Sequence, residues 1–231
     1  MSTFLELVNK TRNECGASGA DLTSLGGILS KQNALFKQWV IDSWAAIQRK
    51  HRRWGFMERD FSFNTVAGQQ SYAAASLAPT PLTSFREWKP ETFRLYKTSI
   101  GVADEQILVP ITDLQSFRDL YQFGTMSTTQ QRPVAFALDT DKSILLGCTP
   151  DDIYTCRGKY QKAPQILVAD TDEPDVNDYY HDLVMFRAME KYALYNAAPE
   201  VLARAQTEGG RMMNELEAEY LPRIAMPDPL A

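Results

Sequence analysis

The chain has 231 residues, enough for one large domain or two small ones, and its 44% apolar content can fill a buried core. Charged residues make up 23%, and no apolar run reaches the roughly 18–20 residues of a membrane span, so composition argues against a disordered or membrane-spanning chain. A formal net charge of −5 argues against a protein that coats nucleic acid, because such proteins usually carry a basic surface. The N-terminus lacks the basic and apolar regions of a secretory signal, so we expect synthesis and retention in a cytoplasm.

Two helices are predicted before residue 51. Thr3 and Glu6 form a capping box, so the first helix should begin there and end near Gly16. Residues 16–29 are rich in Gly, Ser and Ala and predict a loop, after which Ser30 can cap a second helix that runs to about residue 50. Apolar positions of the second helix form a broad stripe that must be buried: Leu35, Phe36, Trp39, Val40, Ser43, Trp44 and Ile47.

The second helix ends in a basic cluster, residues 49–53, with the sequence Arg-Lys-His-Arg-Arg. Cations at a helix C-terminus complement the helix dipole without any ligand, and the acidic overall balance favours this structural interpretation. The same charges could instead contact DNA phosphate or an acidic partner. For that alternative the candidate contact residues are Lys50, Arg52 and Arg53.

A β-hairpin is predicted over residues 61–72, with the sequence Phe-Ser-Phe-Asn-Thr-Val-Ala-Gly-Gln-Gln-Ser-Tyr. Phe61, Phe63 and Thr65 alternate with polar or small residues, which is the period of a half-buried strand. Gly68 is the centre of a turn, and the last two residues of the segment should begin the return strand.

Further strands are predicted over residues 92–98 and 105–111. A short helix follows, which should begin at a capping box formed by Thr112 and Gln115 and end at Gly124. A three-strand meander then follows over residues 133–138, 143–147 and 153–162. The middle segment of the meander is continuously apolar, which is typical of a central strand.

Helices return after Glu173. The apolar residues of the next helix cover more than one face, so that helix should be packed on several sides. Ala198-Pro199 should end it and start a last helix, in which Gly209-Gly210 indicates either a kink or a close helix crossing. Three prolines make residues 222–231 an unlikely helix and predict an extended tail.

This layout predicts the α+β class, with N- and C-terminal helices forming a helical bundle around a central antiparallel β module. The expected boundaries are residues 1–58 and 173–221 for the bundle, 59–172 for the β-rich module, and 222–231 for the extended C-terminal tail.

The sequence assigns no catalytic, cofactor-binding or metal-binding residue, so we expect neither an enzyme nor a cofactor. His51 and His181 are too few and too distant for a recognisable triad or metal motif. Cys148 and Cys156 could face each other across a predicted hairpin, which would permit a disulfide, but free thiols in a reducing compartment are the favoured interpretation.

Acidic residues gather between positions 170 and 178 and form the best candidate metal site. A calcium loop would require Gly where Asp175 stands, and acids just before a helix also favour the positive end of its dipole, with Asn177 or Asp178 as the cap. The helix cap is therefore the favoured interpretation. A metal-dependent hydrolase that uses these acids is a third alternative for the function.

Several segments match one known family in order over nearly the whole chain: Ile47-Gln48, Trp54, residues 60–72, 93–96, 117–121, 131–136, 145–147, 187–192 and 198–200. In this succession the chain resembles the head-to-tail adaptor (connector) proteins of tailed bacteriophages. The resemblance implies a ring, commonly a dodecamer, that docks below the portal, extends the DNA channel and provides the tail attachment platform. The resemblance implies no enzymatic activity and no cofactor.

The resemblance also implies partners and a location. The expected partners are further copies of this chain, the portal protein, a tail nozzle or tail tube protein and double-stranded DNA passing through the lumen, with no membrane. The expected location is the head–tail junction of the virion, after synthesis in the host bacterial cytoplasm. In related adaptors a C-terminal segment often grips the portal, and the matching candidates in this chain are Leu221, Pro222, Arg223, Ile224, Met226 and Leu230. The alternative function is a DNA-contacting phage packaging or regulatory protein that uses the basic cluster 49–53.

Overall fold

The computed structural model describes residues 2–78, 82 and 84–221. The chain divides into two compact units: a helical unit formed by residues 1–57 and 164–231, and a β unit formed by residues 58–163. The fold is α+β, with helices from both ends of the chain flanking a β module, as predicted. Residues 164–172, which the sequence boundaries assigned to the β-rich module, belong to the helical unit.

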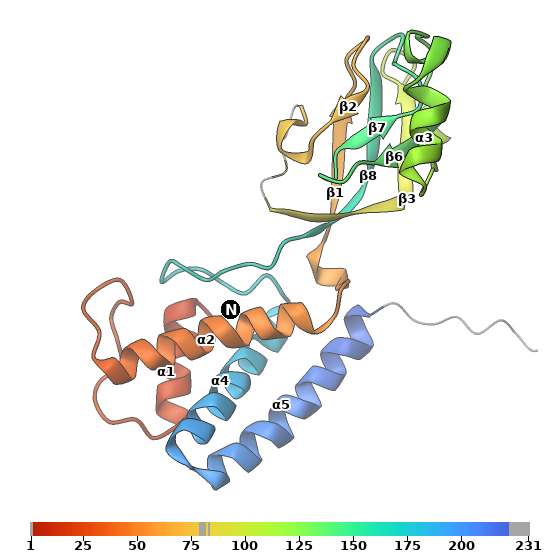
Figure 1. The fold of residues 1–231 in the computed structure, drawn as a ribbon. Helices are drawn as coiled ribbons and strands as arrows, with labels where there is room; N and C mark the ends of the chain where they lie inside the picture. The colour runs from red at the N-terminus through yellow and green to blue at the C-terminus, as the bar shows by residue number, and fades with distance from the viewer. Residues whose placement is uncertain (1, 79–81, 83, 222–231) are drawn as a thin grey trace, which may run out of the picture. The chain divides into compact units, whose positions relative to one another are not determined.

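The long helices of the helical unit are α1 (Phe4–Glu14), α2 (Lys31–Lys50), α4 (His181–Asn196) and α5 (Pro199–Tyr220). Helix α4 contacts each of the other three, as Figure 1 shows. Its buried residues accordingly lie on several faces, which confirms the prediction made from their spacing: His181, Leu183, Val184, Met185, Ala188, Met189 and Ala193.

Helix ends follow the predicted capping chemistry. Thr3 and Glu6 form both hydrogen bonds of a capping box at the start of α1. Ser30 caps α2 by accepting from the Asn33 backbone N–H, and Pro199 occupies the first turn of α5, where its missing N–H costs nothing. These local signals set the predicted starts of three helices, because Thr3 and Ser30 accept from backbone N–H groups that the helix leaves open and Pro199 has no such group to satisfy.

Among the residues that the structure describes, the strands of the β unit form two four-stranded sheets. The first sheet has the order β1 (Glu58–Asn64), β8 (Tyr154–Lys162), β3 (Phe85–Lys97) and β4 (Gln106–Ile107). The second has the order β2 (Ser71–Tyr72), β7 (Ile144–Leu146), β6 (Ala135–Leu138) and β5 (Val109–Pro110). All neighbouring strands are antiparallel except β5 and β6, which are parallel.

The two sheets bury one shared aromatic core. Phe93 of β3 and Phe136 of β6 stack across it, with ring centroids 4.4 Å apart and planes only 7° from parallel. Helix α3 (Leu114–Tyr121) covers the other face of the second sheet, where Phe117 packs on Ala137 and Leu145. Strand β7 is therefore buried on both faces and has neighbours on both sides, which confirms that its continuous apolar run marks a central strand.

The predicted hairpin over residues 61–72 is wrong. Strand β1 and the positive φ of Gly68 are present, but Ser71 and Tyr72 pair with β7 in the other sheet, while β1 pairs with β8. The chain thus arches from one sheet to the other, and the Tyr72 hydroxyl closes the arch by accepting from the Val66 N–H and donating to the Gln69 carbonyl. The turn residues predict that the chain reverses direction here, but they do not determine which strand the next segment pairs with.

The predicted meander and the strand over residues 105–111 also require correction. The first two meander strands pair as β6 and β7, whereas the third, β8, belongs to the opposite sheet. Residues 105–111 form two separate short strands, one in each sheet, with buried Leu108 between them. The cap of α3 is Asp113 rather than Thr112, since the Asp113 carboxylate accepts from the N–H groups of Gln115 and Ser116.

Candidate functional site

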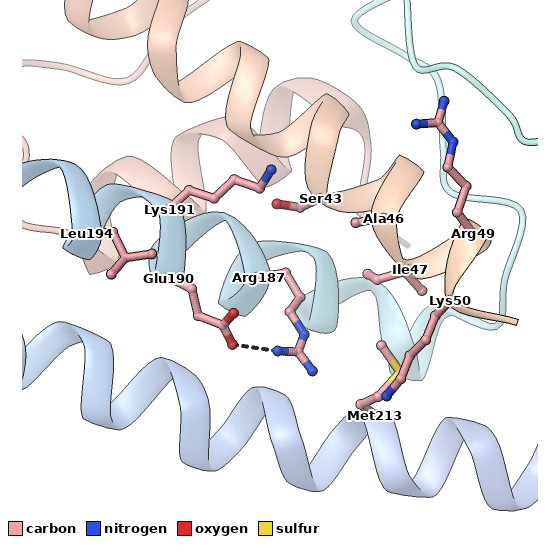
Figure 2. Close-up of a pocket in the computed structure, with 10 residues that line it drawn as sticks. All are labelled: Ser43, Ala46, Ile47, Arg49, Lys50, Arg187, Glu190, Lys191, Leu194 and Met213. Atoms are coloured by element: carbon pink, nitrogen blue, oxygen red, sulfur yellow. Dashed lines mark hydrogen bonds and ion pairs between the residues drawn. The ribbon is translucent and has the colours of Figure 1, made fainter.

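A groove of about 610 Å³ runs along the helical unit between α2, α4 and α5, and Figure 2 shows its lining. Apolar side chains from all three helices form part of its wall: Ala46, Ile47, Leu194 and Met213. Ile47 and Met213 are buried in the core, whereas Leu194 is 71% exposed although it is large and apolar. A concave surface with a partly apolar wall is a candidate site for a partner to cover. We call this feature the α2–α4–α5 groove.

Four cations line the groove, Arg49 and Lys50 from α2 and Arg187 and Lys191 from α4, and Figure 2 shows the Arg49 guanidinium pointing away from the other lining side chains. Arg187 is paired with Glu190, which also lines the groove, at 2.7 Å. Lys191 lies 4.0 Å from Asp42. Arg49 is exposed and makes no ion pair or hydrogen bond with any residue that the structure describes. The groove therefore offers positive charge beside apolar surface, which suits a partner that carries both carboxylates and apolar side chains.

One polar group in the groove wall is buried and unsatisfied. Ser43 is fully buried, and its hydroxyl finds no hydrogen-bond partner in the part of the chain that the structure describes. A buried hydroxyl without a partner costs about 1–3 kcal/mol, and the full burial of Ser43 also keeps its hydroxyl out of reach of an incoming group.

The structure places the predicted basic cluster at the end of α2. Lys50 and His51 both contact Glu217 of α5, at 2.7 and 2.9 Å. The hydrogen bonds from Lys50 and then His51 hold the pKa of the Glu217 carboxyl below its ordinary value. Arg52 is exposed and Arg53 half-buried, and both make contacts within the protein. Much of the cluster is therefore engaged in structure, and Arg49 and Lys50 are its members that line the groove.

Arg187 and Lys191 were missed as candidate residues in the sequence. They lie four residues apart on α4 and so share a helix face, which is a signal that the sequence does contain. Nothing local in the sequence indicates that this face meets Arg49 and Lys50, because the contact between α2 and α4 is a tertiary one.

The acids that formed the candidate metal site organise the loop before α4. An Asp170 carboxylate oxygen accepts from the Leu25 N–H, and Asp172 accepts from the N–H groups of Val168 and Ala169. Asn177 caps the turn that leads into α4 by accepting from Tyr179. Within the described residues, no group of three or more His, Cys, Asp or Glu side chains is arranged to hold a metal ion.

His181 and the three cysteines, to which the sequence assigned no chemistry, have structural surroundings. His181 is buried, with its ring nitrogens near the Ser2 N–H and the Val176 carbonyl, and Cys15, Cys148 and Cys156 are free and buried. Burial raises the pKa of the Cys15 thiol to about 12 and also raises the pKa of the Cys156 thiol. Thiols with raised pKa values are poor nucleophiles at neutral pH.

A family model described as SU10 adaptor protein matches residues 2–227. The chain belongs to the SU10 adaptor protein family. The match covers nearly the entire chain and supports a phage head-to-tail adaptor role, with a place in the virion and with portal and tail proteins as partners in an oligomer. A structural adaptor family is not an enzyme family. A search of curated proteins gave no match.

Most of the adaptor's predicted portal-docking residues lie outside the described residues: Pro222, Arg223, Ile224, Met226 and Leu230. Leu221 is described; it follows the last turn of α5, is half-buried, and packs against the helical core. Among the described helices, none combines the length and the apolar character that crossing a membrane requires.

Proposed function

We propose that this adaptor assembles with copies of itself into a ring, most simply a dodecamer, that docks below the portal, extends the DNA channel and provides the tail attachment platform. The observation that carries the proposal is the family match over residues 2–227, which includes both the helical unit and the β unit. Proteins of this kind act by presenting surfaces to neighbours, and the α2–α4–α5 groove is such a surface.

The charge of the adaptor is compatible with a DNA channel. A dodecamer of chains at −5 each carries about −60 in total. A lumen of net negative charge repels DNA phosphate and lets the duplex slide, whereas a basic lumen would retain it through counterion release.

Negative-stain imaging of the purified adaptor with and without purified portal tests the assembly. We expect monomers or weak association alone and rings on the portal when both proteins are present, because ring surfaces are commonly completed on the partner. Failure of the adaptor to bind portal, or turnover of a substrate by the purified adaptor, would contradict the proposal.

We propose further that residues 221–231 dock onto the portal. Deletion of residues 222–231 should abolish portal binding while the thermal unfolding of the adaptor is unchanged. A matched control replaces only Arg223 with Ala and keeps the apolar positions Ile224, Met226 and Leu230, and it should still bind. Unaffected binding by the deletion variant would remove the tail from the docking site.

One observation favours the alternative function, contact with duplex DNA. Arg187 and Lys191 line the same groove as Arg49 and Lys50 and so add positive charge to that surface. A protein that binds DNA through these cations should bind free duplex with an affinity that falls steeply as salt rises. For an adaptor we expect no such binding at physiological salt, since its formal net charge of −5 opposes the approach of DNA phosphate. Fluorescence anisotropy with a labelled duplex distinguishes the two functions.

A further inference from the structure

Helix α2 has a second packed side that faces away from the groove. Gln165 packs there: the Trp44 indole N–H donates to the Gln165 side-chain oxygen at 3.1 Å, and Gln48 exchanges two hydrogen bonds with the Gln165 backbone, at 3.0 and 2.7 Å. At 3.6 residues per turn, Trp44 and Gln48 lie roughly 150° around α2 from the groove positions Ser43, Ala46 and Lys50. The helical unit therefore presents two different surfaces on nearly opposite sides of one helix.

The outer surface of this second side is apolar, and half-buried acidic residues follow it in the chain. Ile166 is 68% exposed and Val168 is 73% exposed, while Leu167 between them is buried, so alternate side chains of the segment point outward. Asp170, Asp172 and Glu173 follow directly, and none of the three forms an ion pair with a residue that the structure describes. Asp170 and Asp172 accept hydrogen bonds from backbone N–H groups, so their carboxylates keep their charge without a cationic partner among the described residues. We call residues 166–173 the acidic–apolar segment.

The acidic–apolar segment and the α2–α4–α5 groove both expose apolar side chains, and their charged residues are mostly of opposite sign. The groove combines an exposed leucine and other apolar side chains with four cations, and the segment combines two exposed aliphatic side chains with three carboxylates that lack ion pairs among the described residues. A ring is built from heterologous contacts, in which two different and complementary surfaces of one chain meet on neighbouring copies. Surfaces on opposite sides of α2 meet this requirement, since one copy can engage a neighbour on each side.

We propose that the acidic–apolar segment of one copy docks into the α2–α4–α5 groove of the next copy. This inference rests on the proposed ring function. In the contact, Ile166 and Val168 cover Leu194 and the apolar wall, while the carboxylates approach Arg187 and Lys191. Free duplex DNA would satisfy the cations but leave Leu194 and the exposed aliphatic pair without cover, so a second copy of this chain accounts for more of the surface.

Cysteine cross-linking on the portal-bound ring tests the contact directly. Ala46 lines the groove and is exposed, so the Ala46→Cys, Val168→Cys double variant should yield a ladder of linked dimers, trimers and larger chains with a short bismaleimide. Each single variant alone should give no ladder, and a mixture of the two should give dimers. The native cysteines are buried and should not react, which the wild-type adaptor verifies. The control pair Val168→Cys with Thr207→Cys, on exposed α5 surface, should not link.

Charge reversal gives an independent readout in the same assembly. Lys191→Glu should weaken ring assembly on the portal about tenfold, and adding Glu173→Lys should restore most of the loss if the two side chains approach each other. Lys31→Glu carries the same charge change on the first turn of α2, away from the groove, and should assemble normally. A thermal unfolding scan of each variant shows whether any loss reflects the fold.

The outcomes separate this inference from the proposed function. Rings that form without the Ala46–Val168 ladder would overturn the contact while the adaptor function stands. A dimer from Val168→Cys alone would also overturn it, because that pattern requires a two-fold contact between identical surfaces. If no ring forms on the portal at all, the proposed function fails and the contact fails with it.

Discussion

Gly209 and Gly210 are neighbours in α5 but meet different surroundings. A Cβ built on Gly209 would lie 3.1 Å from the Cβ of Phe186 in α4, whereas one on Gly210 meets nothing within 4 Å. The glycine pair therefore marks a close helix crossing at Gly209, one of the two interpretations that the sequence left open. Because the contact atom on Phe186 is attached to the α4 backbone, it cannot move aside without the helix.

The pair makes a matched stability test. Gly210→Ala should stabilise the helical unit by about 0.5–1 kcal/mol, since alanine restricts the unfolded chain and the site is open. Gly209→Ala should lose that gain and destabilise by about 1–3 kcal/mol, because the added methyl group separates α4 from α5. Urea unfolding of both variants measures the difference. Equal stabilisation by the two substitutions would contradict the close crossing.

The stabilisation that Glu217 provides at the end of α2 depends on pH. Its pKa is lowered in the folded protein by Lys50 and His51, so the stabilisation is present above the unfolded pKa and is lost as pH falls through the folded value. Glu217→Gln should therefore lower the free energy of unfolding by about 0.5–1 kcal/mol at pH 7 and have little effect near pH 3. Chemical unfolding at the two pH values checks this. A cost that is the same at both would show that the ion pairs contribute nothing.

At the scale of elements, helices could be predicted from the sequence and strand partners could not. Helix starts at Thr3, Ser30 and Pro199 depend on hydrogen bonds within a few residues, so local sequence contains the relevant chemistry. Strands β1 and β8 pair although the paired residues are 91 to 103 positions apart in the chain, and no local signal indicates a partner at that distance. For the same reason the sequence predicted the basic end of α2 but not the groove that it forms with α4.

The pairing of β3 with β8 contains an irregularity that depends on Gly158. Lys89 pairs with Lys159 and Arg94 with Arg157, so the intervening residues of β3 stand opposite the single residue Gly158. A Cβ there would lie 3.0 Å from the rings of both Phe61 and Phe93. The missing side chain thus leaves room for two aromatic rings of the sandwich core.

Gly158→Ala should therefore destabilise the β unit by about 1–3 kcal/mol through overpacking. Near-UV circular dichroism should report loosened aromatic packing, and thermal unfolding should report the lower stability. Gly27→Ala is the control, because Gly27 lies in the helical unit with open space around its Cα. A wild-type melting temperature for Gly158→Ala would show that the two rings move aside at no cost.

At the scale of the whole molecule, the β unit is one continuous insertion into the sequence of the helical unit. The chain enters it through β1 and leaves it through β8, and these strands are antiparallel neighbours in which Glu58 pairs with Gln161. Paired residues lie about 5 Å apart, so the two ends of the insertion are adjacent. Each unit also has its own hydrophobic core. Adjacent ends and separate cores are properties of independently folding domains.

We therefore expect residues 58–163, expressed alone, to fold into the same two-sheet structure. The isolated unit should unfold cooperatively and give a dispersed amide NMR spectrum, because its aromatic core lies entirely within it. Phe136→Ala in the isolated unit should cost about 3–5 kcal/mol if the native stack with Phe93 is present. A broad, non-cooperative transition, or a melting temperature that Phe136→Ala leaves unchanged, would show that the β unit needs the helical unit to fold.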